Sequence, residues 1–212
     1  NQLQMKNLAR DWFTTRHEVI GARSLEEAGQ IADRFVAQVE KADIDSLAKV
    51  PLLLTIAAIV FEKSPWGDLP PTIATLYEQF VNLLSSRQEL TPPGIEALSA
   101  NDAWIWEKRE ALIENTAYRW FFGSGQSIFE AALGLVTGSK NHVTKDTPQL
   151  RDRLRGVLTH SGVVVAVAND LEWVHLSIAE YLASRVLARK ATPERWLWFA
   201  DRPTTANIAR LA

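Results

Sequence analysis

The chain has 212 residues, of which 47% are hydrophobic and 23% charged, and its formal net charge is -2 at pH 7. A chain of this size and composition can bury enough apolar surface to fold without covalent staples. The net charge gives no electrostatic basis for binding nucleic acid or an anionic membrane. The absence of cysteine excludes disulfides, thiol catalysis and thiolate metal sites. We expect a cytoplasmic protein, because a reducing compartment suits this composition.

The hydrophobic segments are too short to span a bilayer. The longest apolar run, residues 51–61, is about half the roughly 20 residues that a transmembrane helix needs, so we expect no membrane partner. The first residues lack the layout of a signal peptide and an initiator methionine, and the last residues form part of another expected helix. We therefore expect the chain to be a fragment of a longer protein.

The first half of the chain has the pattern of packed helices. Ser24 and Glu27 have the spacing of a capping box, and a helix from about residue 25 to 41 is expected behind them. Pro51 suits the first position of a second helix, whose residues 52–61 are apolar on almost every side and should be buried. Further helices are expected at residues 72–86 and 102–121, with a connection rich in helix breakers at 87–101 between them.

The second half predicts a different arrangement. Helices are expected at residues 127–136 and 148–159, the latter capped by Thr147. Two strands at 163–168 and 171–174, joined by a tight Asn169–Asp170 turn, should form a hairpin. The last helix should begin at the cap Ser177, with Glu180 completing a second capping box. This order of helix, helix, two-stranded wing and helix is that of a winged helix-turn-helix variant.

The predicted fold class is therefore mainly α. We expect a helical subdomain over residues 1–122 and a winged-helix subdomain with a small two-stranded β wing over 126–190. Residues 191–212 should begin a linker or helical arm.

No complete active site is visible in the sequence. The segment from Gly134 to Lys140 has the wrong glycine spacing for a phosphate-binding loop, and it follows an expected helix instead of a strand. None of the four histidines has a metal-binding partner at helical spacing, so we expect no metal site. No nucleophile elbow is present. We predict that this chain by itself is not an enzyme.

A DNA-binding winged helix is the main alternative of another class. Arg151 and Arg155 lie on one face of the helix that would enter the major groove. Asp146 and Asp152 lie close to them, and the chain is net acidic, so nucleic acid is not the favoured partner. A helical scaffold for protein interactions is a third reading.

Three stretches together resemble the region that follows the ATPase core in NACHT-type signalling ATPases of the STAND class. They are LAKVPLLLTIAAIVFEK (47–63), LPPTIATLYEQFVNLL (69–84) and LTHSGVVVAVANDLEWVHLSIAEYLASRVLA (158–188). Their order and spacing also agree with the family. Val50 replaces the common Asn of the first motif, and Ile178 and Ala179 replace the common Phe-Gln of the third.

The resemblance implies a role in controlling nucleotide state. Similar proteins hold ADP between the ATPase core and the helical and winged-helix domains, and exchange for ATP exposes surfaces for oligomerisation. His175 matches the histidine that contacts the ADP β-phosphate, and Pro51 matches the proline that packs by the adenine. The cofactors would be ADP and ATP, with Mg²⁺ in an upstream nucleotide-binding domain that carries the Walker residues. A sensor domain would follow, in defence or transcriptional signalling.

The residues around His175 suit this transfer. The imidazole is expected between a strand and the start of a helix, where the helix dipole and free backbone N–H groups favour an anion. A histidine satisfied within the fold, and a proline at Pro51 that only starts a helix, remain the alternatives. Glu180 is better explained as a capping partner than as a catalytic acid.

Overall fold

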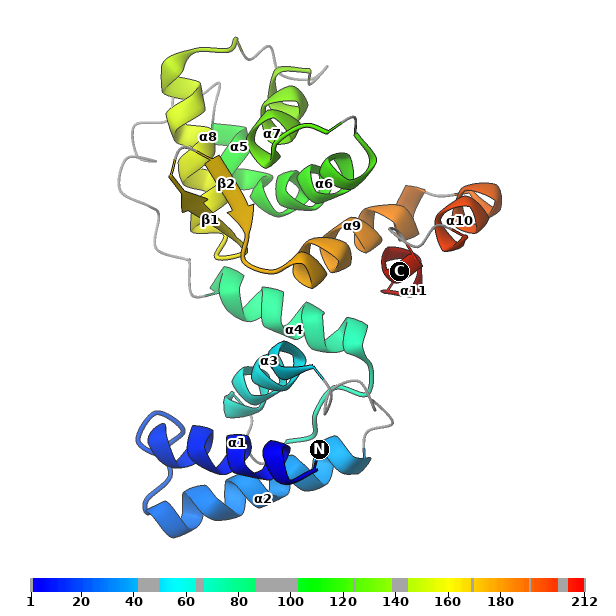
Figure 1. The fold of residues 1–212 in the computed structure, drawn as a ribbon. Helices are drawn as coiled ribbons and strands as arrows, with labels where there is room; N and C mark the ends of the chain where they lie inside the picture. The colour runs from blue at the N-terminus through cyan, green and yellow to red at the C-terminus, as the bar shows by residue number, and fades with distance from the viewer. Residues whose placement is uncertain are drawn as a thin grey trace. The chain divides into compact units, whose positions relative to one another are not determined.

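The structure is a computed structural model, and it is mainly helical with a two-stranded antiparallel sheet near the C-terminus (Figure 1). The predicted fold class is confirmed. The described residues are 2–41, 50–63, 67–86, 103–123, 125–138, 145–168, 170–190, 192–201 and 206–211. They divide into two compact units, Asn1–Leu83 and Leu84–Ala212. Among the helices described, none combines the length and the apolar character that crossing a bilayer requires.

The first unit is built from helices alone. They are α1 (Gln2–Thr15), α2 (Leu25–Lys41), α3 (Pro51–Glu62) and α4 (Ile73–Ser86), whose last turn extends past the division. The predicted cap of α2 is confirmed in part: Ser24 Oγ accepts the Glu27 amide at 3.1 Å. The Glu27 carboxylate, however, accepts from the Arg23 amide at 2.6 Å and not from that of Ser24. It thus satisfies a backbone N–H one residue earlier than a capping box does.

Three phenylalanines form the centre of this unit. Phe13 of α1, Phe35 of α2 and Phe61 of α3 are almost fully buried, with ring centroids 5.4–5.8 Å apart in edge-to-face geometry. Such pairs add to the free energy that burial of the rings already provides. The predicted burial of α3 on most sides is confirmed, since seven of its residues are buried. A helix with apolar residues on almost every side is stable only where other elements cover most of its surface.

The second unit combines the remaining helices with the sheet. Its elements are α5 (Ala103–Glu107), α6 (Arg109–Phe122), α7 (Ile128–Thr137), α8 (Pro148–His160), β1 (Val164–Val167), β2 (Asp170–Trp173), α9 (Leu176–Lys190), α10 (Pro193–Ala200) and α11 (Ala206–Leu211). α6 packs against α9 and α7, and α8 packs against β1 of the hairpin (Figure 1). Thr147 caps α8 as predicted, because its Oγ1 accepts the Leu150 amide at 3.1 Å.

The single long helix predicted at 102–121 is wrong. The structure has two helices, α5 and α6, separated at Lys108, whose φ of -102° and ψ of 16° leave the helical region. Arg109 stabilises the break, since its guanidinium lies 4.5 Å from the Trp106 ring and donates to the Trp106 carbonyl at 3.2 Å. That carbonyl is one of those that a helix end leaves unsatisfied.

The predicted hairpin is present, but β1 is shorter than the predicted 163–168 and β2 begins at Asp170, which was predicted to lie in the turn. β1 and β2 pair antiparallel with Val164 opposite Trp173 and Val167 opposite Asp170. Ala168 enters the turn with a φ of 52°. Asn169, the other residue of the predicted turn, lies outside the described residues. The connection predicted at 87–101 lies outside them as well.

The compact units divide at residue 83, whereas the predicted subdomains divide at 122–126. α6 lies within the predicted helical subdomain, but it packs against α7 and α9 of the predicted winged-helix subdomain. The first structural unit therefore holds α1 to α3 and most of α4, and the second holds the last turn of α4 and α5 to α11. The predicted limits of 126–190 enclose α7, α8, the hairpin and α9.

Candidate functional site

His175 lies at the junction between β2 and α9, and its side chain is exposed. Its ring Nδ1 accepts the backbone N–H of Ser177 at 3.1 Å. Its carbonyl oxygen accepts the amides of Ile178 at 3.2 Å and Ala179 at 3.4 Å. These are the contacts of a helix N-cap residue.

The predicted cap at Ser177 is therefore wrong. α9 begins at Leu176, so Ser177 already lies in the first turn. Its hydroxyl is 2.8 Å from His175 Nδ1 instead of bonding the next turn. The prediction relied on serine being a preferred cap, but the strand ends early enough for the imidazole to occupy that position.

The capping contact determines the state of the neutral imidazole. A backbone N–H can only donate, so Nδ1 of His175 must be the acceptor nitrogen. The proton of the neutral ring is then assigned to Nε2. The exposed ring consequently has an N–H donor at Nε2 that the helix cap does not use, and such a donor can bind an anion.

The free amides expected at the start of α9 are largely used. The N–H of Ser177 bonds the His175 ring, and those of Ile178 and Ala179 bond the His175 carbonyl. A bound anion could not take these donors without breaking the cap. An anion at this position would be attracted by the positive end of the α9 dipole, and its direct hydrogen bond would come from the imidazole of His175.

Glu180 is half-buried one turn after this junction. Burial raises the pKa of its carboxyl group, and the hydrogen bond from Asn207 and the charge of His175 act in the opposite direction. Asn207 Nδ2 donates to Glu180 Oε1 at 3.4 Å. The predicted capping role of Glu180 is wrong, because the Ser177 amide and hydroxyl both contact His175.

Pro51, the other predicted nucleotide contact, is the first residue of α3. It is exposed, and the preceding Val50 is extended, as a residue before proline usually is. The prediction that it starts a helix is confirmed. It belongs to the first unit and His175 to the second. Its contact with an adenine stays a prediction.

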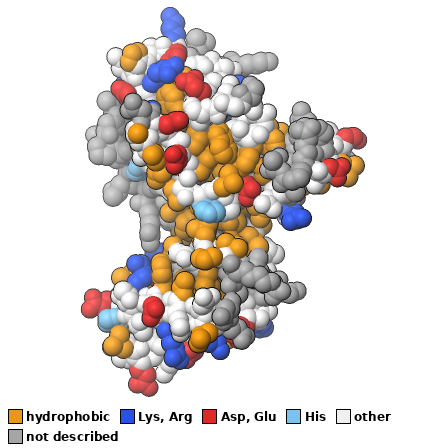
Figure 2. Space-filling view, in the orientation of Figure 1, with side chains coloured by type: hydrophobic (Ala, Val, Ile, Leu, Met, Phe, Trp, Pro, Cys, Tyr) orange, Lys and Arg blue, Asp and Glu red, His pale blue; other side chains and the backbone are white. Residues whose placement is uncertain are grey.

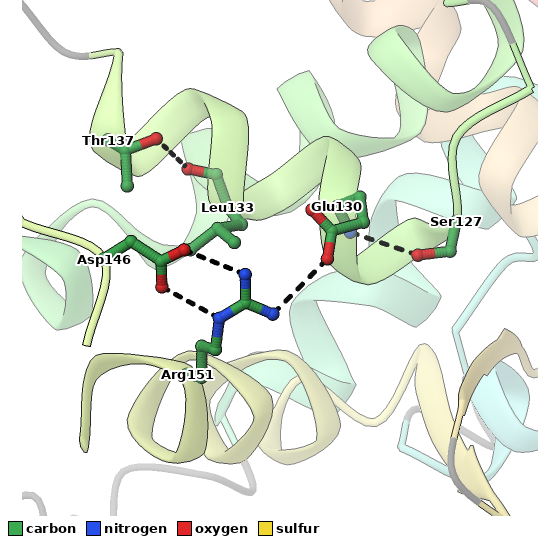
Figure 3. A network of polar contacts seen from close by, with 6 residues as sticks. All are labelled: Ser127, Glu130, Leu133, Thr137, Asp146 and Arg151. Atoms are coloured by element: carbon green, nitrogen blue, oxygen red, sulfur yellow. Dashed lines mark hydrogen bonds and ion pairs between the residues drawn. The ribbon is translucent and has the colours of Figure 1, made fainter. Parts of the chain in front are cut away.

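Arg151, which the DNA-binding alternative requires, is already paired. Its guanidinium donates twice to Asp146 at 2.8 Å and once to Glu130 at 3.5 Å (Figure 3). These hydrogen bonds lower the pKa of Asp146 and raise that of Arg151. Ser127 caps α7 by accepting the backbone N–H of Glu130, so Glu130 lies in the first turn of this helix. The positive charge of Arg151 is therefore compensated within the unit, contrary to what binding a phosphate backbone needs.

A cavity of about 250 Å³ lies near the same junction. Its walls include Trp120 from α6, Asp170, Glu172 and Trp173 from β2, and Leu176 at the start of α9. None of these residues was predicted to line a cavity, and Asp170 was named from the sequence as part of the predicted turn. Trp120 and Trp173 are far apart in the chain, and no local pattern relates them.

Within the described part of the chain, no group of three or more His, Asp or Glu side chains could hold a metal ion. Comparisons of the chain with known protein families, with curated proteins and with solved structures give no match. Any function must therefore be argued from the residues themselves.

Proposed function

We propose that this chain is the ADP-dependent lid and transmission region of a NACHT-type signalling ATPase. The proposal combines the sequence resemblance with the order α7, α8, hairpin, α9, which is that of a winged helix. The observation that carries it is the geometry of His175. The imidazole is exposed where β2 meets α9, and its Nδ1 is held by the Ser177 amide, which assigns the donor to Nε2.

In this proposal the Nε2–H of His175 donates to the β-phosphate of ADP held by an upstream core. A hydrogen bond to a charged group contributes about 1.5–3 kcal/mol. That corresponds to an affinity change of roughly 10- to 150-fold. Differential binding of this size is enough to bias a two-state switch towards a closed form. The positive end of the α9 dipole adds to the attraction.

The other parts of the proposal follow from the same resemblance. Pro51 would pack by the adenine, and Mg²⁺ and the hydrolytic residues would belong to the upstream domain. ATP would release the lid and expose surfaces for oligomerisation, and the region after α9 would lead to a sensor domain. This chain would itself perform no catalysis.

The test must separate phosphate binding from helix capping, because His175 caps α9 in the structure. Aspartate is a good N-cap residue and interacts favourably with the helix dipole, but it repels a phosphate. In the full-length protein, we expect His175→Asp to keep thermal stability within about 1 kcal/mol of wild type. ADP retained after purification should fall at least tenfold, as measured by extraction and ion-exchange chromatography.

The variant His175→Ala should lose both thermal stability and ADP retention, since alanine neither caps the helix nor donates to an anion. Wild-type ADP retention by a stably folded His175→Asp protein would remove the phosphate contact. A full-length gene without a phosphate-binding loop upstream of this chain would overturn the whole proposal.

A further inference from the structure

α11 (Ala206–Leu211) is a short helix that packs chiefly against α9 and α10 (Figure 1). It has six residues, and a helix of this length is not stable alone in water, because so few hydrogen bonds do not offset the cost of nucleation. Its helical order therefore depends on the surface against which it packs. Undocking of α11 and its unfolding are one event.

One apolar side chain anchors α11. Ile208 is 0% exposed, whereas Asn207 and Arg210 on the same helix are exposed and Leu211 is half-buried. Burial of the isoleucine is favourable in proportion to the apolar area that it removes from water. This single anchor is small beside α9, in which eight residues are buried. We therefore expect α11 to open locally while the core around α9 stays closed.

Glu180 of α9 makes a polar contact with α11. Its Oε1 accepts a hydrogen bond from Asn207 Nδ2 at 3.4 Å, which is longer than a typical hydrogen bond. The side chain is half-buried, and burial raises the pKa of its carboxyl group, with the Asn207 hydrogen bond acting in the opposite direction. While α11 is docked, ionised Glu180 loses hydration that this one hydrogen bond does not replace.

The charged groups on the neighbouring elements do not compensate this carboxylate. Glu114 of α6 takes Arg185 and Arg189 of α9 as its ion-pair partners. Arg210 of α11 is exposed, and among the described residues it has no ion pair with Glu180. Glu172 of β2 has the same sign of charge. Ionised Glu180 therefore weakens the contact between α9 and α11.

Glu180 also lies close to the N-cap of α9. The charge of His175 acts on the pKa of the Glu180 carboxyl group, so the two side chains are near enough to interact. In Figure 2, a histidine side chain and an acidic side chain lie near each other, among hydrophobic side chains, over the first half of α9. The carboxylate that contacts α11 is thus next to the imidazole that caps α9.

We propose that α11 is a latch on α9, held by Ile208, weakened by the carboxylate of Glu180, and released by a local opening that leaves the rest of the second unit folded. Release removes Asn207 from Glu180 and so changes the surroundings of His175. The latch does not depend on the proposed function, because it requires no nucleotide and no ATPase core.

The chain has no cysteine, so one introduced thiol reports on this opening. In Ile208→Cys the thiol is buried while α11 is docked, and it reacts with methyl methanethiosulfonate once α11 is released. Leu187→Cys, at a position of α9 that is 1% exposed, reacts only when the core opens, and Leu197→Cys, at a position that is 66% exposed, reacts freely. We expect Ile208→Cys to react about 100-fold faster than Leu187→Cys and about tenfold more slowly than Leu197→Cys, as measured by mass spectrometry.

A second substitution tests the role of the carboxylate. Glu180→Gln removes the charge but keeps an oxygen that accepts from Asn207. Added to Ile208→Cys, it should slow the labelling at pH 7 by about threefold or more, because the docked state no longer buries a charge. The same loss of charge in Glu172→Gln, at an exposed position of β2, should leave the labelling rate unchanged.

The link to the N-cap has its own measurement. Ile208→Asp places a charge where the docked helix buries an apolar group, so it should release α11. The Hε1 resonance of His175 should then move in the proton NMR spectrum. The Hε1 resonance of His160, at the end of α8, should stay in place and show that the unit remains folded. An unmoved His175 resonance would remove the link between the latch and the N-cap.

The labelling rates can contradict the latch in two ways. If Ile208→Cys reacts as slowly as Leu187→Cys, α11 opens only together with the core. If it reacts as fast as Leu197→Cys, α11 is not docked. Equal responses to Glu180→Gln and Glu172→Gln would show a general charge effect and overturn the role of Glu180.

Amide hydrogen exchange repeats the measurement without a substitution, since cysteine fills less space than isoleucine. In the unsubstituted chain, the amides of residues 208–211 should exchange about 100-fold faster than those of the buried residues of α9. Protection of the two helices to the same degree would overturn the latch independently of any variant.

Discussion

Glu114 shows how a single buried charge is stabilised in this protein. Its side chain is 9% exposed on α6, and it faces two arginines of α9. Arg185 Nε lies 2.8 Å from Oε1, and Arg189 donates to Oε2. Both carboxylate oxygens are therefore paired, as a buried carboxylate requires. The arginines remain partly exposed, so their own desolvation is limited.

We predict that Glu114→Gln lowers the free energy of unfolding by about 1.5–3 kcal/mol, the range for hydrogen bonds to charged groups. The two arginines would lose their charged acceptor although the shape is kept. Urea unfolding followed by circular dichroism measures the change. Glu110→Gln, an exposed position on the same helix, should stay within about 0.5 kcal/mol of wild type. Equal effects of the two substitutions would contradict a special role for Glu114.

Glu180 predicts a dependence of stability on pH. Burial raises the pKa of its carboxyl group above the ordinary value of 4.5, so the folded state binds the proton more tightly than the unfolded state. The stability that this protonation contributes is present below pH 4.5 and is lost as the pH rises through the folded pKa. Ionised Glu180 is consequently unfavourable in the folded protein at neutral pH.

We expect Glu180→Gln to be more stable than wild type at pH 7, by less than about 1 kcal/mol because the side chain is only half-buried. The advantage should disappear below pH 4.5, where both side chains are neutral. Thermal unfolding of the two proteins across this pH range measures it. A difference that is the same at pH 4 and pH 7 would show that the carboxyl group does not titrate differently on folding.

At the scale of elements, capping residues explain where α7, α8 and α9 of the second unit begin. Ser127 and Thr147 accept the amides of Glu130 and Leu150 at 3.2 and 3.1 Å and so begin α7 and α8. His175 begins α9 with its ring nitrogen. Serine and threonine are recognisable caps in a sequence, whereas a histidine cap depends on where the preceding strand ends. This is why Thr147 was predicted correctly and His175 was not.

Thr147→Ala should destabilise the protein by about 1 kcal/mol, because the Leu150 amide loses its acceptor at the start of α8. Thr147→Ser keeps the hydroxyl and should change stability by only a few tenths of that. The melting temperatures of the two variants, with wild type as reference, measure the cap. Equal melting temperatures for Ala and Ser would contradict a capping role for the hydroxyl.

At the scale of the whole molecule, each unit has its own core. The first is centred on Phe13, Phe35 and Phe61, and the second on residues of α6 and α9 together with α7 and α8. In the first unit, Glu62 is also buried and accepts from Trp12 Nε1 at 2.7 Å and from Arg16. This contact joins α1 to the end of α3.

We predict that Phe35→Ala destabilises the first unit by about 3–5 kcal/mol, through lost burial and the cavity left between the other two rings. Amide hydrogen exchange in α1, α2 and α3 should accelerate accordingly. Val19→Ala serves as the control, since Val19 is 68% exposed and its truncation removes no core contact. Unchanged exchange in Phe35→Ala would mean that the three rings do not form the stabilising core.

The sequence predicted the elements well where the signal is local. Helix α2 follows from apolar residues at every fourth position, and the hairpin follows from two short β-rich runs. The break at Lys108 was missed because Arg109 stabilises it through a contact with Trp106 that periodicity does not reveal. Within the candidate site, His175 was singled out by its match to the family motif, and its position before a helix agreed with that match, but its capping contact was not predicted.

By itself, the sequence determined the fold class and most helix and strand ranges, because periodicity and turn chemistry act between near neighbours, while the candidate residue His175 came from the family resemblance. Only the tertiary structure decided which residue caps α9, that Glu114 lies between Arg185 and Arg189, and that Trp120 meets Trp173. The cap depends on where β2 ends, and the other two contacts join residues far apart in the chain. They depend on how whole elements pack, since packing against another element, and not local sequence, decides which side chains meet.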